Sequence, residues 1–199
     1  MIHYYEDLIR SVRIRLNQLP DRPSAFKEFT SVALPLDELI ASVIEQGVNE
    51  IIDEISPHAY PEPKKFGDGA SWVSEHDYLV PLPADFKRLV TFRLTGWERS
   101  VDRLIMPDDA DYQEMFSKFT MIRGTPSRPR CYYVPDEGRG RLLASSCERD
   151  VERIASALYV PVALQKGNGS ERTIDFPSVI RDRVVARVAA LTREIIDNN

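Results

Sequence analysis

The side chains best suited to metal binding or proton transfer at neutral pH are three histidines, His3, His58 and His76. No two of them stand at the spacing that pairs metal ligands on one helical turn or hairpin. The sequence therefore gives little support to a zinc site or a general base, and we expect surface or loop residues. A metal-dependent hydrolase would need a cluster of carboxylates and histidines, which the sequence does not show.

Paired acids are a second possible source of chemistry. Asp108 and Asp109, like Asp136 and Glu137, could bind a hard cation through their carboxylates. Their positions favour helix capping for the first pair and turn formation for the second. The sequence Ser145-Ser146-Cys147 offers a hydroxyl and a thiol, but no partner histidine is near it.

Short glycine motifs are a third possibility, because such loops can hold phosphate. Gly67-Asp-Gly69, Gly138-Arg-Gly140 and Gly167-Asn-Gly169 lack the helix start that a phosphate-binding loop needs. We therefore expect a protein with no catalytic residues, no metal and no cofactor.

Charge and cysteine content restrict the partners. The net charge of −5 argues against nonspecific coating of DNA, which needs a basic face. Cys131 and Cys147 lack CxxC spacing and fit reduced, apolar side chains in an intracellular setting. No apolar run approaches the roughly 18–20 residues of a membrane span, so we expect no membrane contact.

The arginines have more than one interpretation. They could form a solvated face with nearby acids, engage the carboxylates of a neighbouring subunit or partner, or contact phosphate. Because acids are mixed in throughout, direct reading of DNA is the weakest of the three. The arginines concerned are Arg181, Arg183, Arg187 and Arg193 near the end of the chain, and Arg123, Arg128 and Arg130 in its middle.

Three amphipathic segments must position these side chains. Apolar residues at helical spacing predict helices over about Ile2–Leu19, Leu36–Ile55 and Pro177–Ile196. Gly47 lies in the middle of the second helix, where it costs roughly 1 kcal/mol relative to alanine, so we expect close helix packing there. The fold class expected is α+β, a bundle of long N- and C-terminal helices with a β-rich insertion.

The insertion, about residues 72–164, alternates strand patterns with turns. A hairpin turn is predicted between the segments Cys131–Val134 and Arg141–Ser145. A short helix capped by Asp108 or Asp109 is expected to run to about Phe119. Its inward side chains would be Tyr112, Met115, Phe116 and Phe119. With helices over about 1–57 and 176–199, the whole chain 1–199 is expected to form one domain.

The last helix has an apolar face to spare. Its main stripe is Ile180, Val184, Val188, Leu191 and Ile195, and a second stripe is Val179, Val185, Ala186, Ala189 and Ile196. A helix that is apolar over most of its circumference must be covered on several sides, in part by a neighbouring subunit. The expected contacts with another subunit or partner are Val185, Ala189, Ile196, Arg183, Arg187 and Arg193.

The order of several short motifs resembles bacteriophage head-to-tail connector or adaptor proteins, including tail tubular A-like ring proteins. The motifs are Tyr5-Glu-Asp-Leu-Ile9, Val80-Pro-Leu-Pro-Ala-Asp-Phe-Lys-Arg-Leu89, Gly124-Thr-Pro before Tyr132-Tyr-Val, and Leu158-Tyr-Val-Pro-Val-Ala-Leu164 before an alanine-rich final helix. The chain departs from the pattern in the Pro61–Ser71 excursion and in lacking a doubled tyrosine in the last strand.

The resemblance implies a structural virion protein of the neck or tail, assembled in the host cytoplasm. It would form a homo-oligomeric ring, typically of twelve copies, between the portal protein and tail or nozzle proteins. DNA would pass through the lumen without specific binding, which an acidic chain permits. The alternative is a small-ligand-binding or regulatory protein with a groove in the β-rich middle, lined by Trp72, Trp97 and Phe116.

Overall fold

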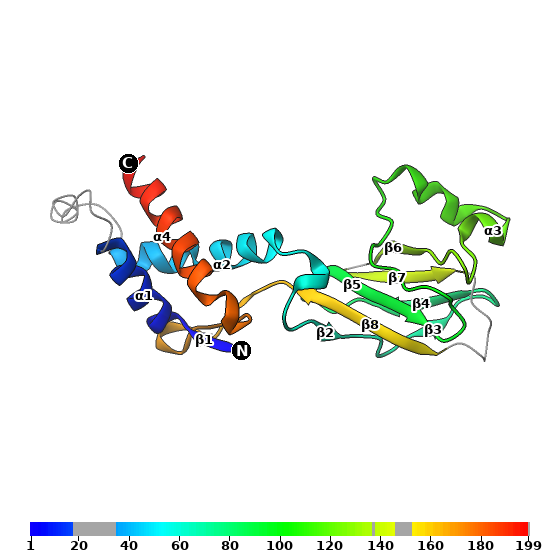
Figure 1. Cartoon of the computed structure of the whole chain (residues 1–199), viewed down its shortest axis with the longest axis horizontal. Coiled ribbons are helices and arrows are strands. Elements are labelled where there is room, and N and C mark those ends of the chain that lie inside the picture. Colours follow the sequence, from blue (N-terminus) through cyan, green and yellow to red (C-terminus); the bar gives the residue numbers. More distant parts are fainter. Residues whose placement is uncertain (18–34, 137, 146–152, 199) are drawn as a thin grey trace. The chain divides into compact units, whose positions relative to one another are not determined.

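The computed structural model describes residues 1–17, 35–136, 138–145 and 153–198 of the chain. They divide into two compact units, Met1–Pro61 with Val162–Asn199, and Glu62–Pro161. Helices dominate the first unit and strands the second (Figure 1). That the whole chain acts as one adaptor-like domain stays a prediction.

Three α-helices pack on one another in the first unit: α1 (Tyr5–Asn17), α2 (Leu36–Glu54) and α4 (Arg181–Asp197). On α2, Ile40, Ile44, Val48 and Ile52 are almost fully buried, at the four-residue spacing of one helix face. The described part of this unit also contains the 3₁₀ turns η2 (Pro57–Ala59), η4 (Gly169–Glu171) and η5 (Ser178–Ile180). The apolar periodicity of α2 therefore corresponds to its packing in the core.

A small antiparallel sheet accompanies these helices. Its strand order is β1 (Ile2–Tyr4), β10 (Thr173–Asp175) and β9 (Gln165–Lys166), which leaves β1 at an edge. Asn49 fixes the chain before β9 to α2, since its side-chain amide donates to the Ala163 carbonyl at 2.8 Å and its oxygen accepts the Ala163 N–H at 3.1 Å. One side chain thereby satisfies both backbone groups of that residue.

The expected bundle of long terminal helices is wrong. The helices are short and scattered among strands, and the chain has a β-rich body with antiparallel sheets. Residues 2–4, expected as helix, form β1 because their backbone pairs with 173–175. At the other end, the 3₁₀ turn η5 precedes α4, so the α-helix begins only at Arg181. Leu19 lies outside the described residues.

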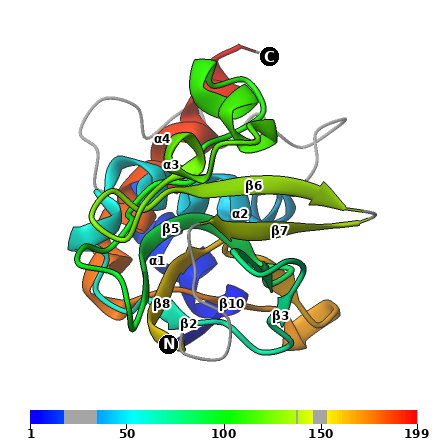
Figure 2. The ribbon, with the colours of Figure 1, turned by 90° about the vertical axis from the view of Figure 1, so that its right-hand side faces the viewer.

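The second unit contains two antiparallel sheets. One has the order β2 (Lys64–Lys65), β8 (Ile154–Pro161), β5 (Phe86–Leu94). The other has the order β3 (Ser71–Trp72), β4 (Asp77–Pro81), β7 (Arg139–Ser145), β6 (Cys131–Asp136). The hairpin expected between 131 and 145 is confirmed, with Cys131 opposite Ala144 and Asp136 opposite Arg139, and Figure 2 shows β6 and β7 extended side by side.

Side chains of both sheets form one core in this unit. Phe92 on β5, Trp97 after it and Leu142 on β7 are each 0–1% exposed. The indole of Trp97 packs edge-on against Phe92, with ring centroids 5.7 Å apart. Both tryptophans of the chain lie in this unit, Trp97 in its core and Trp72 packed against that core. Their fluorescence therefore reports on the second unit alone.

The proline-rich excursion after Pro57 is more regular than expected. Lys64–Lys65 form β2, which pairs with β8, and Phe66 packs edge-on against Tyr159 at 5.9 Å. Lys64 and the Tyr159 hydroxyl both bind the carboxylate of Asp85, at 3.0 and 2.7 Å. Burial and this bond to Asp85 raise the pKa of Tyr159. These contacts hold the excursion against the sheet.

Gly47 on α2 gives a first test, because the close packing expected there is confirmed. A β-carbon at Gly47 would lie 2.7 Å from Cγ2 of Val188 on α4. Gly47→Ala should therefore lower the free energy of unfolding by about 1–2 kcal/mol, despite alanine's better helix propensity. Urea unfolding followed by far-UV circular dichroism measures the change.

Ser42→Ala is the matched control, since Ser42 lies on the exposed side of the same helix. It should be neutral or slightly stabilising. Unchanged or raised stability in Gly47→Ala would show that α2 and α4 do not approach as closely as described.

Candidate interaction surface

Residues 106–130, here called the arm, run between the bridge at Ile105 and strand β6. The arm contains the 3₁₀ helix η3 (Ala110–Phe116) and the single-turn helix α3 (Thr120–Arg123). Figure 1 labels α3. The expected helix through Phe119 is therefore wrong in type and length. At Ser117 the backbone becomes extended, and η3 ends.

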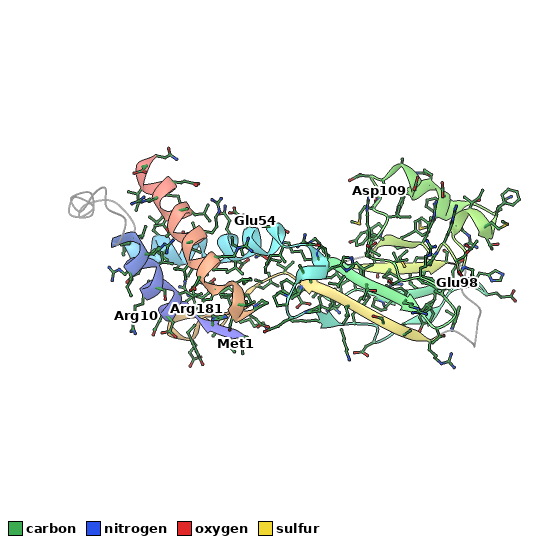
Figure 3. The ribbon with its side chains drawn as sticks, in the orientation of Figure 1. Met1, Arg10, Glu54, Glu98, Asp109 and Arg181 are labelled. Atoms are coloured by element: carbon green, nitrogen blue, oxygen red, sulfur yellow. The ribbon has the colours of Figure 1, made fainter. Side chains whose placement is uncertain are left out.

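Asp109 does not cap this helix with its side chain, contrary to expectation. Its carboxylate instead accepts the backbone N–H of Met106 at 2.7 Å and pairs with Arg103. The hydrogen bond from Met106 and the pairing with Arg103 hold the pKa of Asp109 below its usual value. Asp109 therefore fixes the start of the arm, where Figure 3 labels it.

Large apolar side chains on the arm face solvent. Only Tyr112 of the four expected inward residues is buried, and its hydroxyl donates to the Tyr133 carbonyl at 2.9 Å. A 3₁₀ helix has three residues per turn, so Met115 follows Tyr112 on one side while Phe116 turns away. We call the apolar patch the four exposed side chains Phe116 (68%), Phe119 (72%), Met121 (81%) and Ile122 (43%).

The patch is concentrated. These four residues lie within seven positions of the chain and make up a third of the twelve exposed large apolar side chains of the described residues. Singly scattered apolar residues on a surface need no explanation, whereas a contiguous group marks an interaction site.

A buried ion pair holds the arm in place. The Arg123 guanidinium at the end of α3 donates to the Asp77 carboxylate on β4 at 2.7 Å, and the two side chains are 16% and 12% exposed. Ser74 and Ser145 also donate to Asp77, at 2.8 and 3.0 Å. From β6, the Tyr132 hydroxyl donates to the Arg123 carbonyl at 3.1 Å. The apolar patch therefore sits on a fixed support, which lowers the ordering cost of binding.

Gly124 allows the chain to turn back at this point. Its φ of +138° is a conformation that residues with a side chain rarely adopt. A β-carbon there would also lie 3.2 Å from the backbone nitrogen of Arg130. The motif Gly124-Thr-Pro thus ends α3 and returns the chain to β6.

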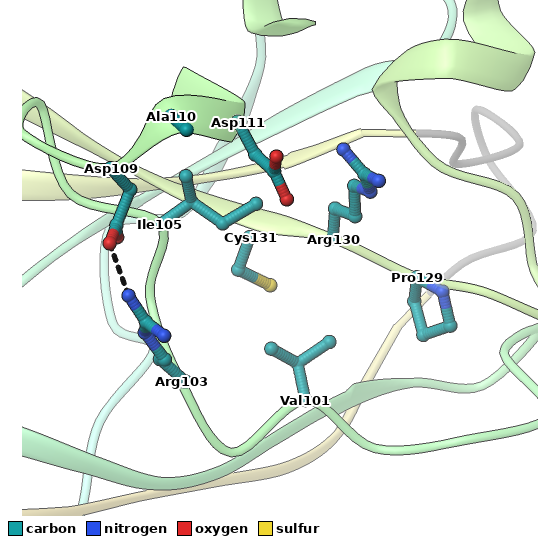
Figure 4. Close-up of a pocket in the computed structure, with 9 residues that line it drawn as sticks. All are labelled: Val101, Arg103, Ile105, Asp109, Ala110, Asp111, Pro129, Arg130 and Cys131. Carbon is teal, nitrogen blue, oxygen red and sulfur yellow. Dashed lines mark hydrogen bonds and ion pairs between the residues drawn. The ribbon is translucent and has the colours of Figure 1, made fainter.

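The arm also covers a pocket of about 380 Å³, drawn in Figure 4. Its two arginines are already paired, Arg103 with Asp109 and Arg130 with Glu114. Trp72, Trp97 and Phe116, the residues expected to line a ligand groove, do not line this pocket. The lining residues are Val101, Arg103, Ile105, Asp109, Ala110, Asp111, Pro129, Arg130 and Cys131.

The candidate chemical groups are dispersed. His3 stacks on Phe176 at 4.0 Å, His58 lies in η2, and His76 lies in the other unit between β3 and β4. Within the described ranges, no three His, Cys, Asp or Glu side chains gather closely enough to hold a metal ion. Ser145 is buried, and its hydroxyl donates a hydrogen bond to Asp77.

The remaining candidates for chemistry either form structural contacts or lie outside the described residues. Asp136 pairs with Arg141 at 2.5 Å across the β6–β7 hairpin. Glu137, Ser146 and Cys147 lie outside the described residues. Gly167 and Gly169 both have positive φ; Gly167 precedes the 3₁₀ turn η4 and Gly169 begins it, and this three-residue turn provides no phosphate-binding helix.

Two arginines of α4 are occupied by acids of α2. Arg183 pairs with Glu54 at 2.8 Å, and Arg187 with Glu50 at 2.5 Å. Hydrogen bonds from Gln46 and Arg187 lower the pKa of Glu50. The interpretation of these arginines as partners of nearby acids within the chain therefore holds for both. Arg193 is half-buried and forms no ion pair with any residue that the structure describes.

The part of the second apolar stripe that lies on α4 is covered, whereas Val179 of the same stripe lies on η5 and is 74% exposed. Val185 and Ala189 are only 8% and 2% exposed within a single copy, and Ile196 is half-buried. Helices α1 and α2 of the same unit pack against α4 and provide that cover. The reason for assigning Val185 and Ala189 to a subunit contact is thereby removed. The arm was missed because its exposed aromatics resemble an inward helix face in sequence.

Comparison with known proteins gives no assignment: the chain matches no family model and none of the curated proteins. In the described part of the chain, no helix combines the length and apolar character needed to cross a membrane.

Asp77→Ala tests the support of the arm. Breaking a buried ion pair costs 3–5 kcal/mol, and we expect about 3 kcal/mol here because both side chains keep slight exposure. Tryptophan fluorescence in urea should show the loss, and trypsin should cut faster after Lys118 and Arg123. Arg103→Ala, at an ion pair whose arginine is 73% exposed, should cost under about 1 kcal/mol. Equal costs for both variants would contradict the role of Asp77.

Proposed function

We propose that this chain is a structural virion protein, a head-to-tail adaptor that joins a bacteriophage portal to the tail. The observation that carries the proposal is the apolar patch on its fixed arm. Four large side chains exposed on a well-anchored support suit a permanent protein contact better than a free surface. An adaptor must make such contacts with its neighbours in the assembly.

The order of sequence motifs supports the same proposal. Two of them have definite structural tasks. In Val80–Leu89, Asp85 binds Lys64 and Tyr159. Strand β4 ends before Asp85, and β5 begins directly after it. Gly124-Thr-Pro ends α3 and directs the chain into β6. These two of the resembling motifs thus shape the β-rich unit and its arm.

The net charge of −5 also agrees with a protein beside a DNA channel. An acidic wall repels the phosphate backbone, so DNA passes without being held. In the proposed assembly, identical copies form a ring, the portal lies on one side, and tail or nozzle proteins lie on the other.

Binding to portal particles tests the proposal. We expect purified portal particles, from the phage genome that encodes this chain, to gain mass in steps of 22.7 kDa when the chain is added. Mass photometry measures the gain, and negative-stain electron microscopy locates it. Portal particles that keep their mass at saturating chain concentrations would contradict the proposed function.

A variant pair ties this binding to the arm. Phe119→Asp with Met121→Asp should reduce portal occupancy at least about tenfold, because charge in the apolar patch disrupts a contact that holds each copy in the assembly. Both side chains are exposed, so the fold should not change. Val73→Asp is the control: Val73 is 57% exposed in the same unit but outside the arm, and its variant should bind normally.

A further inference from the structure

The second part of the arm, residues 116–130, is basic as well as apolar, whereas the acids of the arm, Asp108, Asp109, Asp111 and Glu114, all precede it. Residues 116–130 contain Lys118, Arg123, Arg128 and Arg130 and no acid, in a chain whose net charge is −5. Arg123 and Arg130 are paired with Asp77 and Glu114. Lys118 and Arg128 are exposed and form no ion pair with any described residue. The patch therefore has a positively charged rim, and its occupant should be apolar with acidic side chains around it.

A surface with that chemistry exists on the other unit, around strand β1. Ile2 and Tyr4 point to the same side of this edge strand and are 65% and 56% exposed. Val179 is 74% exposed and follows Ser178, whose hydroxyl contacts the Met1 sulfur at 2.7 Å. We call Ile2, Tyr4 and Val179 the β1 face.

Exposed acids flank the β1 face and outnumber the exposed base Arg10, which lies one turn after Glu6 on α1. Glu6 and Asp7 follow it directly in the first turn of α1, and Asp182 lies at the start of α4. All three are exposed and form no ion pair with any residue in the described ranges. Arg181 donates to the Ser11 hydroxyl at 2.8 Å, which brings the start of α4 beside α1. Figure 3 labels Met1 and Arg181 at this part of the first unit.

We infer that the arm of one copy docks on the β1 face of a second copy of the same chain. Apolar side chains then meet apolar side chains, and Lys118 and Arg128 meet Glu6, Asp7 and Asp182. Contact between two arms would place the unpaired cations opposite one another, so charge disfavours a symmetric arm-to-arm dimer. This inference rests on the proposed function, because it names the contact by which copies of the adaptor join.

The contact is heterologous, since two different surfaces of the chain meet. Each copy then offers one arm and one β1 face, so copies add head to tail, and the chain of contacts closes into a ring when the rotation permits. The side chains of both surfaces are exposed in a single copy, in contrast to the α4 residues of the second stripe, which their own unit covers.

Mixing two variants tests this contact without any portal. The arm variant carries Phe119→Asp and Met121→Asp, and the face variant carries Ile2→Gln and Val179→Gln. All four side chains are 65–81% exposed, so both variants should fold. Each alone should be monomeric in sedimentation velocity at concentrations where the wild-type chain associates. An equimolar mixture should form a complex of twice the 22.7 kDa chain mass and nothing larger.

That result is specific to a heterologous contact, because one intact arm and one intact face remain between the two variants. A face variant that associates as well as the wild type would overturn the inference in favour of arm-to-arm contact. A mixture that stays monomeric would overturn it as well. So would a wild-type chain that remains monomeric up to about 1 mM, beyond the range of a specific contact.

Charge reversal provides an independent measurement. Lys118→Glu with Arg128→Glu should weaken self-association at least about tenfold, and adding Glu6→Lys with Asp7→Lys to the same chain should restore it. Arg99→Glu, at an exposed position of the same unit outside the arm, should have no effect. Loss without restoration would contradict the pairing of these two rims.

Portal binding distinguishes this inference from the proposed function. A chain that binds portal particles but fails the mixing test keeps its function and loses this contact. A chain that passes the mixing test but never binds a portal keeps the contact and loses the function.

Discussion

The carboxylate of Asp77 is the constraint on which the arm depends. It lies largely out of solvent and receives hydrogen bonds from Arg123, Ser74 and Ser145. A buried charge is tolerated only when it is paired and its remaining lone pairs are satisfied. Because these donors come from α3, from the β3–β4 turn and from β7, satisfying one carboxylate fixes three parts of the unit together.

That fixed support explains how the chain can expose aromatic and aliphatic side chains without losing its conformation. A short 3₁₀ helix and a single α-turn have few internal hydrogen bonds and would not persist alone. The Arg123 ion pair and the Tyr132 hydroxyl replace the missing stabilisation from outside the arm. The apolar patch is thus presented in one arrangement, ready for a partner.

The two units differ in which apolar side chains they bury and which they leave exposed. In the first, the apolar sides of α1, α2 and α4 are used up by packing on one another, down to the close approach at Gly47. Ile2, Tyr4 and Val179 remain exposed on β1 and η5, beside acids. In the second, both sheets share a core, and the apolar patch of the arm remains exposed beside Lys118 and Arg128. The β1 face and the apolar patch therefore differ in the sign of the unpaired charges beside them.

The local spacing of apolar and turn residues determined part of this structure. The four-residue spacing of Ile40, Ile44, Val48 and Ile52 specified α2, and Gly47 indicated its close neighbour, because both depend only on helix geometry. The turn residues between Cys131 and Ser145 likewise specified a hairpin. What only the tertiary structure decided is where each apolar face finds cover. Val185 and Ala189 are buried by helices distant in sequence, whereas Phe116 and Phe119 lose their expected cover when η3 ends. Spacing defines a face, but burial depends on which distant segments pack against it.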